Sequence, residues 1–258
     1  MNQNSPDPTN VRAAGKNLEL LRQNSYPGRG IVIGVSDQGL AIQVYWIGGR
    51  SENSQNRVFS YESETGRVFT EAADPTKVKD PSLIIYNAML ERDGNHGNGM
   101  FAVSNGHQTD TIVAEDPTSR GFKKAMDAWQ YEPDRPNFTP RISGYSEIGE
   151  GSIYSVLASL QKKEESDDCR RHLWDIFPSR GLGHCITTYA GDAPDNEPLP
   201  SFRGPPYYVP LLGGIKNIAE LYWTTLNKNT RVALAVKGID LKTKKSEVFI
   251  VNRFMKAA

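Results

Sequence analysis

Cysteine and histidine are scarce in this sequence, with 2 cysteines and 4 histidines among 258 residues. Cys169 and Cys185 are too few for a disulfide framework, and their spacing is not that of a zinc site. The histidines show no HxxxH or HxH pairing that would bring two of them to one metal ion. We therefore expect a protein with neither structural disulfides nor a bound metal.

An excess of charge of one sign is also missing, because Lys plus Arg and Asp plus Glu number 30 each. A chain without net charge has no global field that attracts nucleic acid or an acidic membrane. No apolar run approaches the ~20 residues of a membrane span, and the opening MNQNSPDPTN lacks the basic-then-apolar pattern of a secretory signal. These absences favour a globular cytoplasmic protein that binds neither nucleic acid nor a membrane.

Several well-known catalytic motifs are absent too, since the chain has no Walker loop, no GxSxG elbow and no HExxH. The glycines of GRGIVIG (28–34) precede a predicted strand, whereas those of a dinucleotide fingerprint link a strand to a helix. Function has to be inferred from the apolar pattern and from clusters of polar residues.

Short apolar runs dominate the chain and predict strands. IVIGV and LAIQVYWI flank the turn SDQG, which is typical of a hairpin of two buried strands. Further strands are expected within 56–70, 82–90, 99–105, 141–146, 152–159, 183–190, 231–240 and 246–254. Helical periodicity is limited to 11–24, 121–131 and 213–228. Many strands with few helices favour an α+β fold.

Two segments follow neither pattern. Residues 161–172, QKKEESDDCRRH, carry mixed charge and are expected on the surface. Residues 191–214 hold many of the prolines and predict a long loop, either a lid or an oligomer contact.

Polar residues gather where apolar strands end, which is the usual place for a site on a rigid scaffold. The first cluster contains Arg50 with Ser51, then Asn56 with Arg57. The guanidinium group offers a rigid fork of donors that suits a phosphate. The alternative interpretation is a hairpin loop with exposed arginines.

Three further clusters follow along the chain. Tyr86-Asn87 and SNGHQTD (104–110) each follow an apolar run, and ordinary turns would explain both in part. Tyr131-Glu132 are expected at the end of a helix, and Arg141 follows a loop stiffened by three prolines. A structural ion pair is the simpler explanation of this last cluster.

Taken in chain order, these clusters resemble the archaeal-type IMP cyclohydrolase family. The resemblance covers about residues 26–145, while 1–25 and much of 146–226 have no clear counterpart. We therefore expect an N-terminal extension (1–25) before a single domain (26–258) with a Pro-rich insertion around 191–214. The matching features are Tyr26-x-Gly28-Arg29, Arg50-Ser51 with Asn56-Arg57, Tyr86-Asn87, VSNGHQTD at 103–110, Tyr131-Glu132 and Thr139-Pro140-Arg141-Ile142.

The resemblance implies a four-layer αββα sandwich like that of the N-terminal-nucleophile hydrolases, used without a processed nucleophile. It implies closure of the ring of 5-formamidoimidazole-4-carboxamide ribonucleotide to inosine monophosphate with loss of water, without metal or redox cofactor. In this reaction a base must take a proton from the carboxamide nitrogen, and the formyl oxygen must be stabilised and then protonated.

Residue roles follow from the matched motifs. The 5′-phosphate is expected to bind Arg50, Ser51, Asn56 and Arg57. The base and carboxamide are expected to contact Tyr86, Asn87, Asn105 and Gly106. Glu132 and Asp110 are the expected acid/base pair, with His107 in reserve, and the oxyanion is expected to be stabilised by Tyr131 and Arg141.

Two alternatives stay open at this point. The chain could be a purine-nucleotide-binding relative with lost or altered chemistry, or a structural or homo-oligomeric interaction protein whose polar loops are only turns. Binding of purine mononucleotides distinguishes the interaction protein from the other two, and turnover distinguishes the enzyme from the binding relative.

Overall fold

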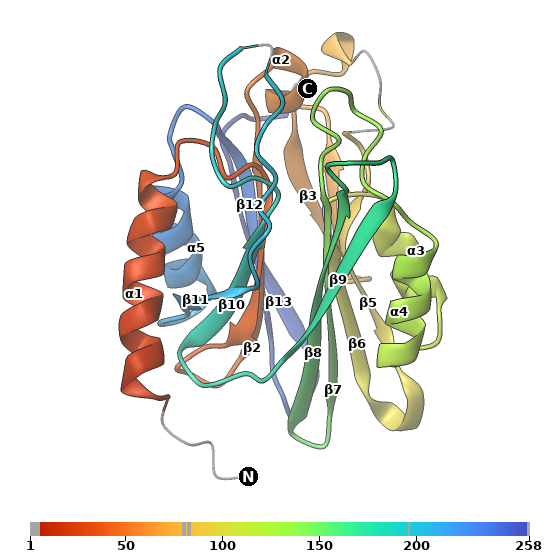
Figure 1. Ribbon diagram of the computed structural model, residues 1–258. Coiled ribbons are helices and arrows are strands. Elements are labelled where there is room, and N and C mark those ends of the chain that lie inside the picture. Colours follow the sequence, from red (N-terminus) through yellow and green to blue (C-terminus); the bar gives the residue numbers. More distant parts are fainter. Residues whose placement is uncertain (1–5, 79–80, 82–83, 196, 257–258) are drawn as a thin grey trace.

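The computed structural model describes residues 6–78, 81, 84–195 and 197–256. Two antiparallel sheets lie face to face, and helices cover the outer face of each sheet (Figure 1). The α+β prediction is confirmed, and the layers follow the order helix, sheet, sheet, helix.

The strands form two sheets of nearly equal size. Within the described residues, the first sheet has six strands, in the order β11 (Tyr207–Pro210), β10 (Leu182–Thr187), β1 (Gly30–Val35), β2 (Ala41–Gly48), β12 (Arg231–Ile239) and β13 (Ser246–Asn252). The second sheet, counted over the same residues, has seven strands in chain order: β3 (Val58–Glu62), β4 (Arg67–Glu71), β5 (Asn87–Asp93), β6 (Gly99–Ser104), β7 (Arg141–Gly149), β8 (Ser152–Lys162) and β9 (Cys169–Ile176).

Every residue of β1 is buried, because both faces of this strand are covered. Ile31 and Ile33 belong to the core between the sheets, and Val32 packs toward the outer helices. The alternation follows from the two-residue period of a strand. Ile142 and Leu157 of the second sheet complete the inner core, so a nearly continuous apolar run was the correct signal for a strand in the middle of four layers.

Two helices cover each outer face. On the first sheet these are α1 (Pro8–Gln23) and α5 (Ile215–Thr225), and on the second sheet α3 (Gln108–Ala114) and α4 (Ser119–Asp127). The connections hold α2 (Glu52–Gln55), η1 (Pro75–Lys77) and η3 (Asn95–Gly97). No helix among the described residues is long and apolar enough to cross a membrane.

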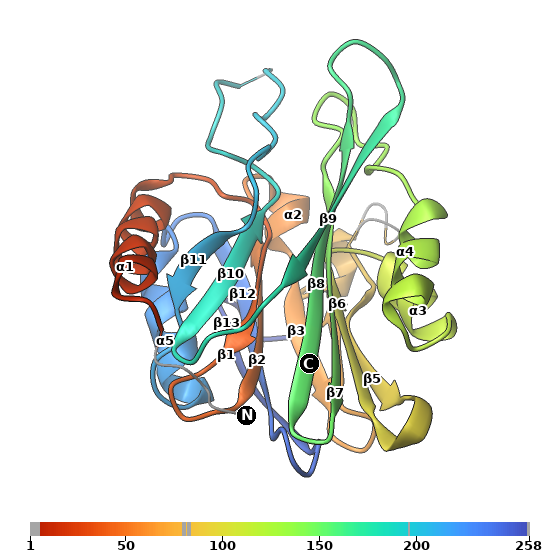
Figure 2. The same cartoon turned by 60° about the horizontal axis from the view of Figure 1, so that its bottom comes forward.

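The two sheets contact each other along one side of the sandwich, and loops project at one end. Along one side β13 contacts β3, where the Asn252 amide exchanges hydrogen bonds of 2.9 Å with the backbone N–H and C=O of Phe59. At one end, the β8–β9 connection and the segment that follows β10 project together (Figure 2). The short helix α2 lies at the same end (Figure 1).

Three segments without a predicted helix or strand contain regular elements. The mixed-charge segment 161–172 includes the end of β8 and the start of β9, an edge strand that is half exposed and therefore carries polar residues on both faces. SNGHQTD runs directly into α3, whose Ile112 packs against the second sheet. The Pro-rich segment 191–214 includes β11, and its Asn196 lies outside the described residues.

Two predicted boundaries are wrong. The helix predicted to end at Tyr131-Glu132 is α4, and it ends at Asp127, so both residues lie in the loop 128–140. Tyr86 and Asn87 do not end a strand: β5 begins at Asn87. Ser82 and Leu83 of the predicted strand 82–90 lie outside the described residues.

One pH effect follows from the fold. His184 of β10 stacks near Tyr208, with ring centroids 4.7 Å apart, and its buried Nδ1 has no hydrogen-bond partner in the described residues. Burial lowers the pKa of His184 to about 4, against an ordinary value near 6.5. Between pH 6.5 and 4 the unfolded chain therefore binds a proton at His184 that the folded protein does not bind. This difference lowers the free energy of unfolding as the pH falls.

We expect His184→Gln to lose less stability than the parent protein between pH 6.5 and 4, by at most roughly 3 kcal/mol. Denaturant unfolding of both proteins across this range measures the difference. Parallel stability curves for the two proteins would contradict the prediction.

Candidate active site

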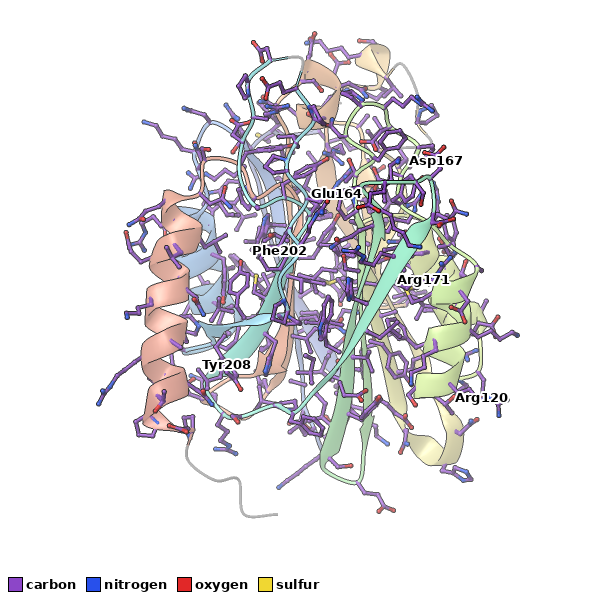
Figure 3. All side chains as sticks on the ribbon, in the orientation of Figure 1. Arg120, Glu164, Asp167, Arg171, Phe202 and Tyr208 are labelled. Carbon is purple, nitrogen blue, oxygen red and sulfur yellow. The ribbon has the colours of Figure 1, made fainter. Side chains whose placement is uncertain are left out.

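A cavity of about 230 Å³ opens at the end of the sandwich where β2 leads into α2. The end of β2, the loops that precede or follow strands of both sheets, and the Pro-rich segment form its wall, and the charged and hydroxyl groups used below are Arg29, Arg50, Ser51, Ser54, Arg57 and Asp134. A larger hollow of about 720 Å³ lies between α1 and the segment that contains Phe202, which Figure 3 labels, and no charged side chain of the described residues lines it. The smaller cavity is therefore the one with charged groups that suit a polar ligand.

Arg57 is the most unusual group in this wall. It is 1% exposed, its Nε donates to the Ser54 carbonyl at 2.9 Å, and its Nη2 donates to the Gly48 carbonyl at 3.4 Å. Its buried Nη1 has no partner among the described residues. Burial lowers the pKa of Arg57, which shows the cost of holding this cation away from water. An anion in the cavity would supply the missing partner.

Arg50 lies nearer the mouth of the cavity. Its Nη1 lies 2.5 Å from an Asp192 carboxylate oxygen and 3.0 Å from the Ala193 carbonyl, and its guanidinium lies 5.3 Å from the centre of the Tyr26 ring. Both side chains of the ion pair are about one-third exposed, so water screens their attraction. The Pro-rich segment thus supplies an exchangeable partner for a cation of the cavity.

A buried ion pair joins the two sheets behind the cavity wall. Arg29, just before β1, donates to the Glu132 carboxylate at 3.2 Å, and Glu132 is 3% exposed. Burial raises the pKa of Glu132, and the charge of Arg29 opposes this rise. Burial is the largest influence on the pKa of Arg29 and would lower it, but Glu132 and three tyrosines together outweigh burial, so the pKa is raised well above its ordinary value. Glu132 is therefore a carboxyl whose proton affinity is set by its surroundings.

Asn105 orders the groups around this carboxylate. Its amide nitrogen donates to Glu132 at 3.4 Å and to the Pro140 carbonyl at 2.9 Å, and its oxygen accepts from the Ile142 N–H at 2.8 Å. Asn105 directly follows the last residue of β6, and these hydrogen bonds thus fix the start of β7. Asn105 holds Glu132 in place, with its own hydrogen bonds satisfied.

Gly106 is needed because Arg141 passes close to it. A Cβ at this position would lie 2.4 Å from Arg141 Nη1. Arg141 donates to Gln108 at 3.1 Å and lies over the Trp129 ring at 4.8 Å. The space beside Gly106 is therefore occupied by the guanidinium group of Arg141.

Tyr86 lies between the sheets. Its hydroxyl is 2.6 Å from that of Tyr45, and both rings act electrostatically on Arg29 and Arg57. These two hydroxyl groups, Arg29, Arg57 and Glu132 form one polar cluster beside the apolar core between the sheets.

Four predicted residues have partners elsewhere. Asn56 bonds through both ends of its amide to the backbone of Asp74, at 2.8 and 2.7 Å. Asn87 donates to the exposed Asp110 at 2.6 Å. Tyr131 donates to the carbonyl of Asp167 on the β8–β9 connection (Figure 3). Neither Asp110 nor Tyr131 lines the cavity.

Sequence reasoning gave no role to Arg29, Asp134 or Tyr189, all of which line the cavity. Arg29 belonged to the matched motif YPGRG, so a signal existed. Asp134 lies inside the proline-stiffened loop, where an aspartate is explained by a turn alone. Tyr189 follows β10 far along the chain, and no local pattern marks it.

Comparison with known proteins bears on these groups. A model of the IMP cyclohydrolase-like protein family matches residues 26–245. The chain belongs to this family. No curated protein and no solved structure matches it. The family match extends past residues 26–145, which carry the resemblance in sequence.

The family match includes every cavity residue named above, and α1 precedes it. Among the described residues, no group of three or more His, Cys, Asp or Glu side chains is arranged to hold a metal ion.

A buried arginine with an unpaired donor should lower the free energy of unfolding of the ligand-free protein. We expect Arg57→Met to stabilise the ligand-free protein by about 1 kcal/mol while it removes anion binding. Arg22→Met, which changes an exposed arginine of α1, is the matched control and should stay within about 0.5 kcal/mol. Denaturant unfolding gives both values. A large loss of stability in Arg57→Met would mean that this guanidinium is structural.

Proposed function

We propose that this protein is an IMP cyclohydrolase, which closes the ring of 5-formamidoimidazole-4-carboxamide ribonucleotide to inosine monophosphate and releases water. The observation that carries the proposal is the unpartnered Nη1 of buried Arg57, because Arg57 lines the same cavity as Arg29, the partner of Glu132. A buried cation with an unused donor and a buried carboxyl thus lie near one cavity in a member of the family.

The 5′-phosphate binds at the cationic wall in this proposal. Arg57 provides Nη1 without first losing another partner, and Arg50 exchanges the Asp192 carboxylate for the phosphate. Ser51 and Ser54 line the same wall and offer hydroxyl groups. Asn56, whose amide is bound to Asp74, supports the loop from behind.

The chemical step moves two protons to the departing oxygen. The carboxamide nitrogen loses one as it attacks the formyl carbon, and the formamido nitrogen loses the other as the C=N bond of the new ring forms; the former formyl oxygen gains both and leaves as water. A single carboxyl can carry the two protons in turn from nitrogen to oxygen, so Glu132 suffices where two carboxylates had been expected. A carboxyl whose pKa is raised by burial is suited to this exchange.

Two cations stabilise the charge that develops on the formyl oxygen. Arg29 lines the cavity beside Glu132, and Arg141 acts electrostatically on the same carboxylate. Positive groups fixed before the reaction lower the barrier because they need no reorganisation. The proposal requires the carboxamide to reach Glu132 between Arg29 and Asn105.

The four layers support a relationship to the N-terminal-nucleophile hydrolase fold, and we include that relationship and a cytoplasmic location in the proposal. No processed nucleophile is needed, because the attacking nitrogen belongs to the substrate. Tyr86 joins the site only indirectly, through its electrostatic action on Arg29 and Arg57. Asn87, which bonds to the exposed Asp110, has no part in the proposed site.

The test compares two carboxylates in otherwise equal variants. Glu132→Gln should lower the rate of ring closure about 10²–10⁴-fold while inosine monophosphate still binds. Asp110→Asn, the exposed control, should stay near the parent rate. Formation of inosine monophosphate from the formamido substrate is measured directly for all three proteins.

If the parent protein binds inosine monophosphate but does not form it from the formamido substrate, the protein is a nucleotide-binding relative and the proposed enzyme function is wrong. Equal rates for the parent and Glu132→Gln would remove Glu132 from the chemistry. A large defect in Asp110→Asn alone would restore the pair expected from the sequence.

A further inference from the structure

The cavity has opposite charge at its two sides. On one side Tyr26 experiences the charges of Arg50 and Arg57. Its ring stacks on that of Tyr189 at 5.7 Å, and the Tyr189 hydroxyl lies 2.5 Å from Thr139 Oγ1. Thr139 in turn bonds to Asp134, so a chain of contacts leads from the cations to a carboxylate that also lines the cavity.

Asp134 is held rigidly. The Thr139 N–H donates to Oδ1 at 2.7 Å, and the Thr139 hydroxyl bonds to Oδ2. A carboxylate only accepts hydrogen bonds, so the Thr139 hydroxyl donates its single proton to Asp134 and must accept from Tyr189. The backbone N–H groups of Asn137 and Phe138 donate to the Asp134 carbonyl at 3.0 and 3.1 Å, which closes the turn.

A carboxylate in an anion-binding cavity needs an explanation, because it repels a phosphate. Two bonds from Thr139 use about half of its roughly four acceptor positions. The remaining positions suit neutral donors placed a short way along the ligand from the anionic group. Ribose hydroxyls are such donors, and a carboxylate is a common partner for the 2′-hydroxyl of a nucleotide.

We infer that Asp134 binds the ribose hydroxyls of the nucleotide and makes the cavity selective for ribonucleotides over 2′-deoxyribonucleotides. This inference rests on the proposed function, since it takes the phosphate to bind Arg50 and Arg57. Thr139 and Tyr189 are positioning residues that fix the carboxylate. The order along the ligand is phosphate at the arginines, ribose at Asp134, and base toward Glu132.

The experiment measures calorimetric binding of inosine monophosphate and its 2′-deoxy form to three proteins: the parent, Asp134→Asn and Asp192→Asn. The parent should prefer the ribonucleotide about 10-fold or more, the effect of one charged hydrogen bond. In Asp134→Asn the preference should fall to about threefold or less, since a neutral acceptor binds more weakly. Asn keeps an oxygen for the Thr139 N–H.

Asp192→Asn is the matched control, because it removes the same charge at the other side of the cavity. It should raise the affinity for both nucleotides together, as Arg50 loses a competitor, and should leave their ratio unchanged. Should Asp134→Asn fail to fold, Thr139→Val tests the same point by freeing the carboxylate, and it should lower the ratio too.

A parent protein that binds both nucleotides equally would overturn the inference and leave the proposed function intact. The same holds if Asp134→Asn keeps the parent's ratio. If the parent binds neither nucleotide, the proposed function itself is wrong.

Discussion

The ion pair between Arg29 and Glu132 is the contact on which the polar end of the sandwich depends. It joins the beginning of β1 in the first sheet to the loop that leads into β7 in the second. Removing one member of a buried pair leaves the other charge uncompensated, at a cost of about 3–5 kcal/mol. The two sheets are therefore held at a fixed distance where the cavity opens, and Asn105 fixes the carboxylate from the other side.

A second buried pair bridges the sheets away from the cavity. Lys237 of β12 is fully buried and lies 2.5 Å from Glu91 of β5, and its Nζ also donates to the Gly66 carbonyl at 2.6 Å. Here every charge has a partner. Arg57 differs, because its buried Nη1 has no partner among the described residues and could donate to an anion.

Loops of four origins meet at the cavity. The segment before β1 supplies Arg29, and the β2–β3 connection supplies Arg50 and Arg57. The 128–140 loop supplies Asp134, with Glu132 behind the wall, and the segment after β10 supplies Tyr189 and the partner of Arg50, Asp192. Such loops carry function because a rigid scaffold positions them. The four packed layers provide that scaffold, since the core between the sheets leaves no freedom to the strand ends.

The sequence alone determined the α+β class and most of the strands, because period and apolarity are local properties that burial on both faces imposes on each strand. The four layers were expected only through the family resemblance. The sequence also pointed to Arg57 and Glu132, through motifs in the order of a family. Edge strand β9 escaped it, since a half-exposed strand carries no apolar run. Only the tertiary structure separated Glu132 from Asp110. Both are carboxylates in matched motifs, but burial beside Arg29 is a contact over 103 residues of chain, and no local pattern encodes a partner so distant.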